Sequence, residues 1–255
     1  MNAHHDNAAG TSARSAASVI IISALASIAA VALDTAAQGR DPLSILQSMV
    51  NIRASHRINH VVAMACIGAL TFGFTVLSQR LGLRRAPVLV GLIAYSAGSM
   101  LMFVATIIDG FISTDTAALF VTKSPEAVRT GYWLIQALAG VALTDIALVA
   151  WVCQSLAAVA WSLALLRDPG LARRIGMVGA VTGALPGVAI VVAGANLTQA
   201  LVVGVLLLQG VWYLGAAACL LVGAKGARMT APETMPRLEE ALLQRTASGP
   251  GSVKM

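Results

Sequence analysis

The chain has 255 residues, of which 58% are hydrophobic and 11% are charged, and its mean hydropathy is +0.81. Soluble domains average about 25% charged residues, so this composition excludes an ordinary water-soluble domain and indicates a chain that lies largely in a bilayer. The formal net charge is +6, yet the basic residues stand at the ends of apolar runs, which is typical of membrane topology signals. We therefore expect lipid to be the main partner and expect no nucleic acid to bind.

Six apolar runs are long enough to cross a bilayer, because a helix needs about 20 apolar residues to span the hydrocarbon. They cover residues 17–36, 60–79, 86–108, 131–166, 175–195 and 199–223. None shows the alternation of a barrel strand, so the backbone must be satisfied within helices. The sequence predicts an all-α polytopic membrane protein: a tail over 1–15, a six-helix transmembrane bundle over 16–224 and a largely disordered tail over 225–255.

Arginines mark one end of this predicted bundle. The second connector carries Arg80, Arg84 and Arg85, and the fourth carries Arg167, Arg173 and Arg174 against the single acid Asp168. An excess of basic residues marks cytoplasmic connectors. Six spans then place both termini in the cytoplasm as well, and the other end of the bundle faces outward.

The first run ends near Asp34, at the predicted outer end. Its short polar start and the small residues up to Ala37 also fit a cleaved signal peptide. We favour an uncleaved membrane helix and keep the signal peptide as the alternative.

The second run opens with the stretch SHRINH, which places His56 and His60 four residues apart on one helical face. That spacing lets both imidazoles reach one ion. Adding Asp109 or Asp34, which are expected at the same depth, gives two histidines and a carboxylate, as in open iron sites and some zinc sites. These four residues are therefore candidate ligands of a divalent metal. Haem is not expected, because two histidines of one helix cannot clasp opposite faces of the ring.

The same stretch also has a simpler interpretation as the polar start of a helix. Ser55 would then be the N-cap, the histidines would face headgroups or water, and Arg57 would repel a cation. No glutamate accompanies the histidines as in the zinc-protease motif. The spacing alone favours this interpretation and leaves the metal site as the alternative.

The fourth run, 131–166, is much longer than a span requires. At about 1.5 Å per residue it would extend roughly 54 Å, against a hydrocarbon core of about 30 Å. We expect one unusually long fourth helix that projects from the outer face. Asp145 lies in its outer part and would suit a proton-coupled carrier or a pH-sensitive gate. We favour the structural interpretation, in which Asp145 pairs with an Arg or His of a neighbouring helix.

The fifth run carries Gly179, Gly183 and Gly187 at four-residue intervals and ends near Asn196, a further polar candidate. Glycines in this register form a flat strip on which another helix can pack closely. The strip therefore predicts a helix contact, either inside the bundle or with a second membrane protein or a second copy of the chain.

Several activities are excluded by what the runs lack. No lysine lies in the middle of an apolar run, so a retinal-type Schiff base is not expected. No glycine-rich loop precedes a Lys-Ser or Lys-Thr pair, so no nucleotide-binding P-loop is present. The three cysteines, Cys66, Cys153 and Cys219, lie inside apolar runs without metal or redox spacing and read as small buried hydrophobic residues.

Two stretches carry a resemblance. The segments RLGLRRAPVLVGLIAYSAGSMLMFVATIIDGF and VAWSLALLRDPGLARRIGMVG resemble uncharacterised bacterial multi-pass inner-membrane proteins, in which an arginine-bearing inner turn accompanies a helix ending in Ile-Asp-Gly. The resemblance covers about half of the membrane domain. It implies a bacterial inner-membrane protein and brings no established activity or site.

Three classes of function fit the sequence. The first is a non-enzymatic carrier, sensor or accessory subunit with a polar cluster on the outer side. The second is a membrane-embedded metal-dependent enzyme that uses His56, His60 and a nearby Asp on a lipid or small hydrophobic substrate. The third is a structural subunit of a larger complex that docks through the glycine strip. The sequence favours the first.

Overall fold

The computed structural model describes the backbone of residues 2–194 and 198–226, and the predicted C-terminal tail lies outside the described residues. The helices are α1 (Asn2–Leu33), α2 (Pro42–Leu81), α3 (Ala86–Ile107), α4 (Thr114–Phe120), α5 (Pro125–Ile135), α6 (Leu143–Leu165), α7 (Leu171–Ala193) and α8 (Gln199–Gly226), with π-helical turns η1 (Ile108–Ser113) and η2 (Gln136–Ala142). Within the described chain, six helical segments are long and apolar enough to cross a membrane. The predicted all-α, six-helix membrane fold is confirmed.

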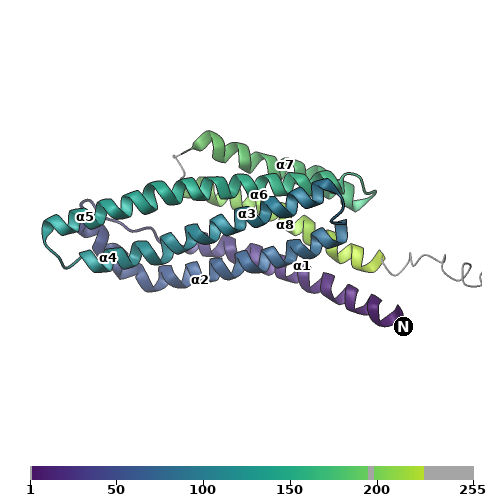
Figure 1. Cartoon of the computed structure of the whole chain (residues 1–255), viewed down its shortest axis with the longest axis horizontal. Coiled ribbons are helices and arrows are strands. Elements are labelled where there is room, and N and C mark those ends of the chain that lie inside the picture. Colours follow the sequence, from purple (N-terminus) through teal and green to yellow (C-terminus); the bar gives the residue numbers. More distant parts are fainter. Residues whose placement is uncertain (1, 195–197, 227–255) are drawn as a thin grey trace, which may run out of the picture.

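Three of the six segments are very long, whereas the sequence predicted only the fourth to be so. They cover Pro42–Leu81, Ala86–Phe120 and Pro125–Leu165, with 40, 35 and 41 residues. Their ends lie beyond the rest of the bundle, where α4, α5 and the start of α2 meet (Figure 1). We call this part the helical extension. Leu46, Ala117, Val128 and Ile135 form its buried core, so each helix continues because the others cover its apolar face.

The start of α2 corrects the prediction that Ser55 is an N-cap. The helix begins at Pro42, and Asp41 is its N-cap, with Ser44 completing a reciprocal capping box. Ser55 lies mid-helix and its hydroxyl donates to the carbonyl oxygen of Ile52 at 2.9 Å. The histidines of SHRINH therefore stand on a continuous helix, with neighbours on both sides, and not at a solvated helix end.

Aromatic rings fill the centre of the bundle around Phe74. Its ring centroid lies 5.0 Å from that of Trp161 and 5.2 Å from that of Trp212. Each indole N–H donates to a serine hydroxyl, Trp161 to Ser78 at 3.0 Å and Trp212 to Ser162 at 2.9 Å. These bonds satisfy polar groups that would otherwise be buried without a partner.

The glycine strip of α7 faces α6 of the same chain. A Cβ atom built on Gly183 would lie 2.9 Å from the Cβ of Ala158, and one on Gly187 would lie 3.0 Å from the Cβ of Ser155. At Gly179 it would lie 2.4 Å from the hydroxyl oxygen of Ser162. The strip is thus occupied inside the bundle, which removes it as a docking face for another subunit.

The arginine-bearing connectors lie at the end opposite the helical extension. Both termini of the described chain lie at this end too (Figure 1). Each connector turns at a glycine with positive φ, Gly82 at 93° and Gly170 at 74°, and Arg85 donates to Asp168 at 3.3 Å between the connectors. The arrangement gives the bundle two chemically different ends; the side of the membrane that each faces stays a prediction.

Candidate functional site

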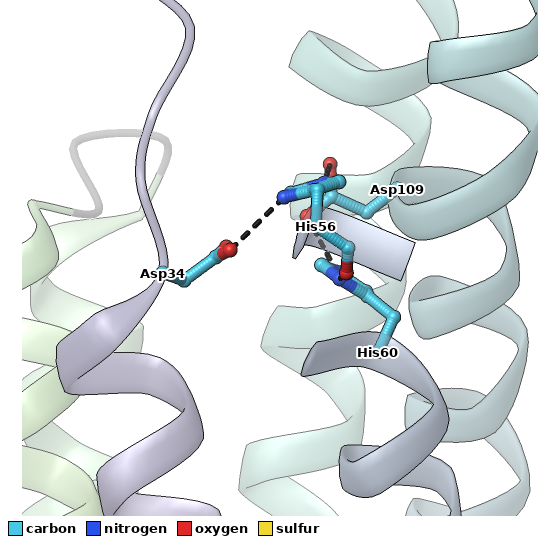
Figure 2. Close-up of side chains that lie close together, drawn as sticks. All are labelled: Asp34, His56, His60 and Asp109. Atoms are coloured by element: carbon cyan, nitrogen blue, oxygen red, sulfur yellow. Dashed lines mark hydrogen bonds and ion pairs between the residues drawn. The ribbon is translucent and has the colours of Figure 1, made fainter. Parts of the chain in front are cut away.

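Four predicted ligand residues converge between the bundle and the helical extension. They are Asp34 just after α1, His56 and His60 on α2, and Asp109 on η1 (Figure 2). One candidate ligand atom from each lies within 4.8 Å of all the others. We call this group the His–Asp cluster. His56 follows Asp34 by 22 residues in the sequence. Asp109 comes from a separate helix, in the third span.

His60 is oriented by its own helix. Its Nδ1 lies 2.8 Å from the carbonyl oxygen of His56, and its Nε2 lies 3.1 Å from Oδ2 of Asp109. A carbonyl oxygen only accepts, so Nδ1 carries a proton, and Nε2 faces the carboxylate oxygen either as a second N–H donor or with a lone pair. Two electron-rich atoms at this distance require a proton or a cation between or beside them. Metal-binding histidines show this arrangement, with the second nitrogen donating to a carbonyl group.

His56 is held from both sides by carboxylates. Its Nδ1 lies 3.0 Å from Oδ1 of Asp34, and its Nε2 lies 3.7 Å from Oδ1 of Asp109. Asn59 also donates to Oδ1 of Asp34 at 3.3 Å, which fixes that carboxylate. With its Nδ1–H donating a hydrogen bond to Asp34, His56 presents Nε2 beside the His60 and Asp109 atoms. Asp34 then orients a ligand through a carboxylate–histidine pair.

The π-helical turn η1 presents Asp109 at the cluster. A π-turn inserts an extra residue in the helix and often marks a functional site. Gly110, next in sequence, lets His60 approach closely: a Cβ at this position would lie 2.5 Å from both Cβ and Cγ of His60. Sequence reasoning missed Gly110, although the Ile-Asp-Gly ending of the third run was its available signal.

Asp34 lies outside the membrane-spanning segments, and two effects act on its pKa. Burial raises the pKa, but the hydrogen bond and charge of His56, with help from Asn59, outweigh burial and hold the pKa below the usual 3.8. Asp34 is therefore ionised at neutral pH. The anionic carboxylate of Asp34 favours positive charge beside it, whether a proton on His56 or a metal cation.

Arg57, which the sequence suggested would repel a cation, is engaged elsewhere. Both Arg53 and Arg57 donate to Oδ1 of Asp115 in α4. The guanidinium of Arg57 also lies over the ring of Phe111, 5.5 Å from its centroid. Asp115 offsets part of the positive charge of Arg53 and Arg57, which weakens the argument against a metal at the neighbouring histidines.

The remaining predicted residues do not join the cluster. Asp145 is exposed on α6, and no Arg or His side chain in the described part of the chain forms an ion pair with it, contrary to the expected pairing. Asn196 lies outside the described residues. The cysteines are free, with Cys66 buried and Cys153 and Cys219 partly buried.

A cavity of about 550 Å³ extends from the His–Asp cluster into the bundle. Its volume lies within the range of sites that bind small molecules. The cluster lines one part of the cavity, and further uncharged polar side chains line it as well. Among them are Tyr95, Gln154, Gln209 and Tyr213. Sequence reasoning did not assign these residues to a site, and the glutamines inside the fourth and last apolar runs, Gln154 and Gln209, were the visible signals.

The geometry defines an integral membrane protein with six candidate spans and a His–Asp cluster beside an internal cavity. The chain matches no family model, and it matches no curated protein and no solved structure.

Proposed function

We propose that this protein is a membrane-embedded, metal-dependent enzyme that acts on a small hydrophobic molecule in its cavity. The observation that carries the proposal is the convergence of Asp34, His56, His60 and Asp109 within 4.8 Å at the cavity wall. Sequence alone placed this function second, because the histidine spacing is a weak signal without an accompanying glutamate and Arg57 next to His56 would repel a cation.

The donor set favours a divalent transition metal. His56, His60 and Asp109 offer two imidazole nitrogens and a carboxylate, the donors that suit zinc and ferrous iron. Ligand bonds of about 2 Å require ligands of one ion to lie within about 4 Å of each other, so the side chains need move inward by only about 1 Å. Three protein ligands leave a coordination position for water or substrate, as catalytic sites do.

A carrier based on Asp145 receives less support. That side chain is exposed on α6 and does not line the cavity, so its titration would not act on a bound solute there. The glycine strip, which suggested a structural subunit, is occupied by α6. We further propose, from the arginine connectors and the resemblance to bacterial proteins, that the cluster lies toward the outer face of a bacterial inner membrane.

Metal content tests the proposal directly. Purified protein, stripped with chelator and reloaded separately with Zn²⁺ or Fe²⁺, is expected to retain about one ion per chain after dialysis. Substituting both His56→Ala and His60→Ala should abolish retention, because the two remaining carboxylates without an imidazole are poor ligands for zinc or ferrous iron. Asp34→Asn should weaken affinity roughly 10- to 100-fold, as loss of an orienting partner does.

The other two histidines of the chain provide a matched control. The double substitution His4→Ala and His5→Ala removes the same number of imidazoles and should leave retention unchanged. A wild-type protein that retains no stoichiometric metal would refute the metal site, as would equal retention by the His56→Ala, His60→Ala protein.

A further inference from the structure

Gln209 on α8 is buried without a partner. Its exposed fraction is 2%, and within the described part of the chain neither its amide nitrogen nor its amide oxygen has a hydrogen-bond partner. Buried polar groups are almost always paired, and leaving one unpaired is costly. An orphaned donor and acceptor on one side chain therefore call for a group that satisfies both.

The cavity supplies the place for such a group, because Gln209 is one of its lining residues. Tyr95, Tyr213 and Gln154 line it too, and both tyrosines pack on Phe74, with ring centroids 4.7 and 5.0 Å away. None of these side chains carries a charge at neutral pH. A charged ligand group beside them would be desolvated with no counter-ion, so this part of the cavity favours a neutral polar group.

The cavity is also elongated and largely apolar between its polar parts. On α2 its lining runs from Met49 to Leu70, which at about 1.5 Å per residue is roughly 32 Å along the helix. Ile67, Met102 and Leu206 belong to the wall. A compact polar solute would leave these apolar side chains in contact with water, whereas an extended hydrocarbon chain would exclude water from them.

We propose that the cavity binds an elongated, uncharged lipophilic molecule whose head group both donates and accepts a hydrogen bond, as a primary amide or a hydroxyl does, and that Gln209 binds this head group. The hydrocarbon body then lies along the apolar wall and extends toward the His–Asp cluster. The assignment of this molecule as substrate rests on the proposed function; the binding site at Gln209 does not.

Metal-free protein in lipid nanodiscs tests the site with two probes, ω-bromododecanamide and bromododecane. Bromine quenches tryptophan fluorescence, and Trp151 lines the cavity. Wild type should bind the amide about tenfold more tightly than the hydrocarbon, the factor expected for hydrogen bonds that relieve a buried amide. Gln209→Leu should lose this preference. Gln136→Leu, at an exposed glutamine outside the cavity, should keep it.

A second readout guards against a folding defect. Removing an unsatisfied amide should raise the Tm of the probe-free Gln209→Leu protein, and Gln209→Met, which keeps an unbranched side chain of similar length, should behave alike in both assays. The inference is overturned if Gln209→Leu or Gln209→Met keeps the amide preference, or if wild type shows none. Because these titrations contain no metal, an amide preference in a protein that retains no ion would refute the proposed function alone, and metal retention without the preference would refute this inference alone.

Discussion

Gly110 decides how closely His60 can approach η1. A Cβ here would lie 2.5 Å from the Cβ and Cγ of His60. These atoms are close to the backbone of α2, so they cannot move away as the end of a long flexible side chain could. Gly110→Ala should therefore displace the imidazole, cost about 1–3 kcal/mol of stability and weaken metal affinity roughly 10- to 100-fold. Thermal unfolding and metal titration of the variant would check both effects.

Gly68 provides the control for that substitution. It is exposed on the same helix as His60, and no heavy atom lies within 4 Å of a Cβ built on it. Gly68→Ala should keep wild-type metal affinity and match or exceed wild-type stability, because alanine is the better helix former. Wild-type affinity in Gly110→Ala would show that the close approach does not position His60.

Sequence could name the ligand candidates but could not bring them together. The four-residue spacing of His56 and His60 is local, and topology placed Asp34 and Asp109 at a similar depth. Convergence depends on rotation of the helices about their axes and on the π-turn at Asp109, neither of which has a local pattern. It also depends on Gly110, which is visible in the sequence but whose contact with His60 forms only when the helices pack. The ion pair between Arg57 and Asp115 joins residues that are distant in sequence, so it could not be predicted for the same reason.

The N-cap of α2 makes the start of the helical extension sensitive to acid. The backbone amide of Ser44 donates to Oδ1 of Asp41 at 3.0 Å and its hydroxyl donates to Oδ2 at 2.9 Å, and these bonds lower the pKa of Asp41 below the usual 3.8. A carboxyl with a lowered pKa stabilises the folded state above its unfolded pKa. That contribution is lost as the pH falls below 3.8 and through the folded value.

Amide exchange at Ser44, corrected for its intrinsic pH dependence, should therefore show protection that declines below pH 3.8 in wild type. Asp41→Asn keeps a capping side chain but cannot titrate, so its protection should not change over this range. Asp41→Ala should exchange fast at every pH. Equal pH dependence in wild type and Asp41→Asn would contradict the assignment.

The lengths of the helices show where apolar runs mislead. The sequence placed the second span at 60–79, because residues 42–59 carry polar and charged groups that a bilayer would exclude. In the structure the helix continues through them from Pro42, since Leu46 and its neighbours pack against α4 and α5. Hydropathy measures preference for lipid, whereas helix length here also depends on packing outside the candidate membrane core.

On the scale of the whole molecule, the two ends of the bundle have different chemistry. One end carries the arginine connectors, and the other carries the helical extension, with the His–Asp cluster between the extension and the bundle. The positive-inside rule predicts that the arginine end is cytoplasmic. A metal or a lipophilic molecule would then reach the cluster from the outer side or from the outer leaflet.

Single cysteines at the two ends test this orientation. Lys123→Cys lies in the exposed turn between α4 and α5, and Arg84→Cys lies in the exposed connector between α2 and α3. In intact cells, a membrane-impermeant maleimide should label Lys123→Cys at once and Arg84→Cys only after permeabilisation. The wild-type chain, with Cys66 buried and its other cysteines partly buried, sets the background. The reverse pattern would place the His–Asp cluster toward the cytoplasm, so that metal would have to be supplied from the cytoplasmic pool.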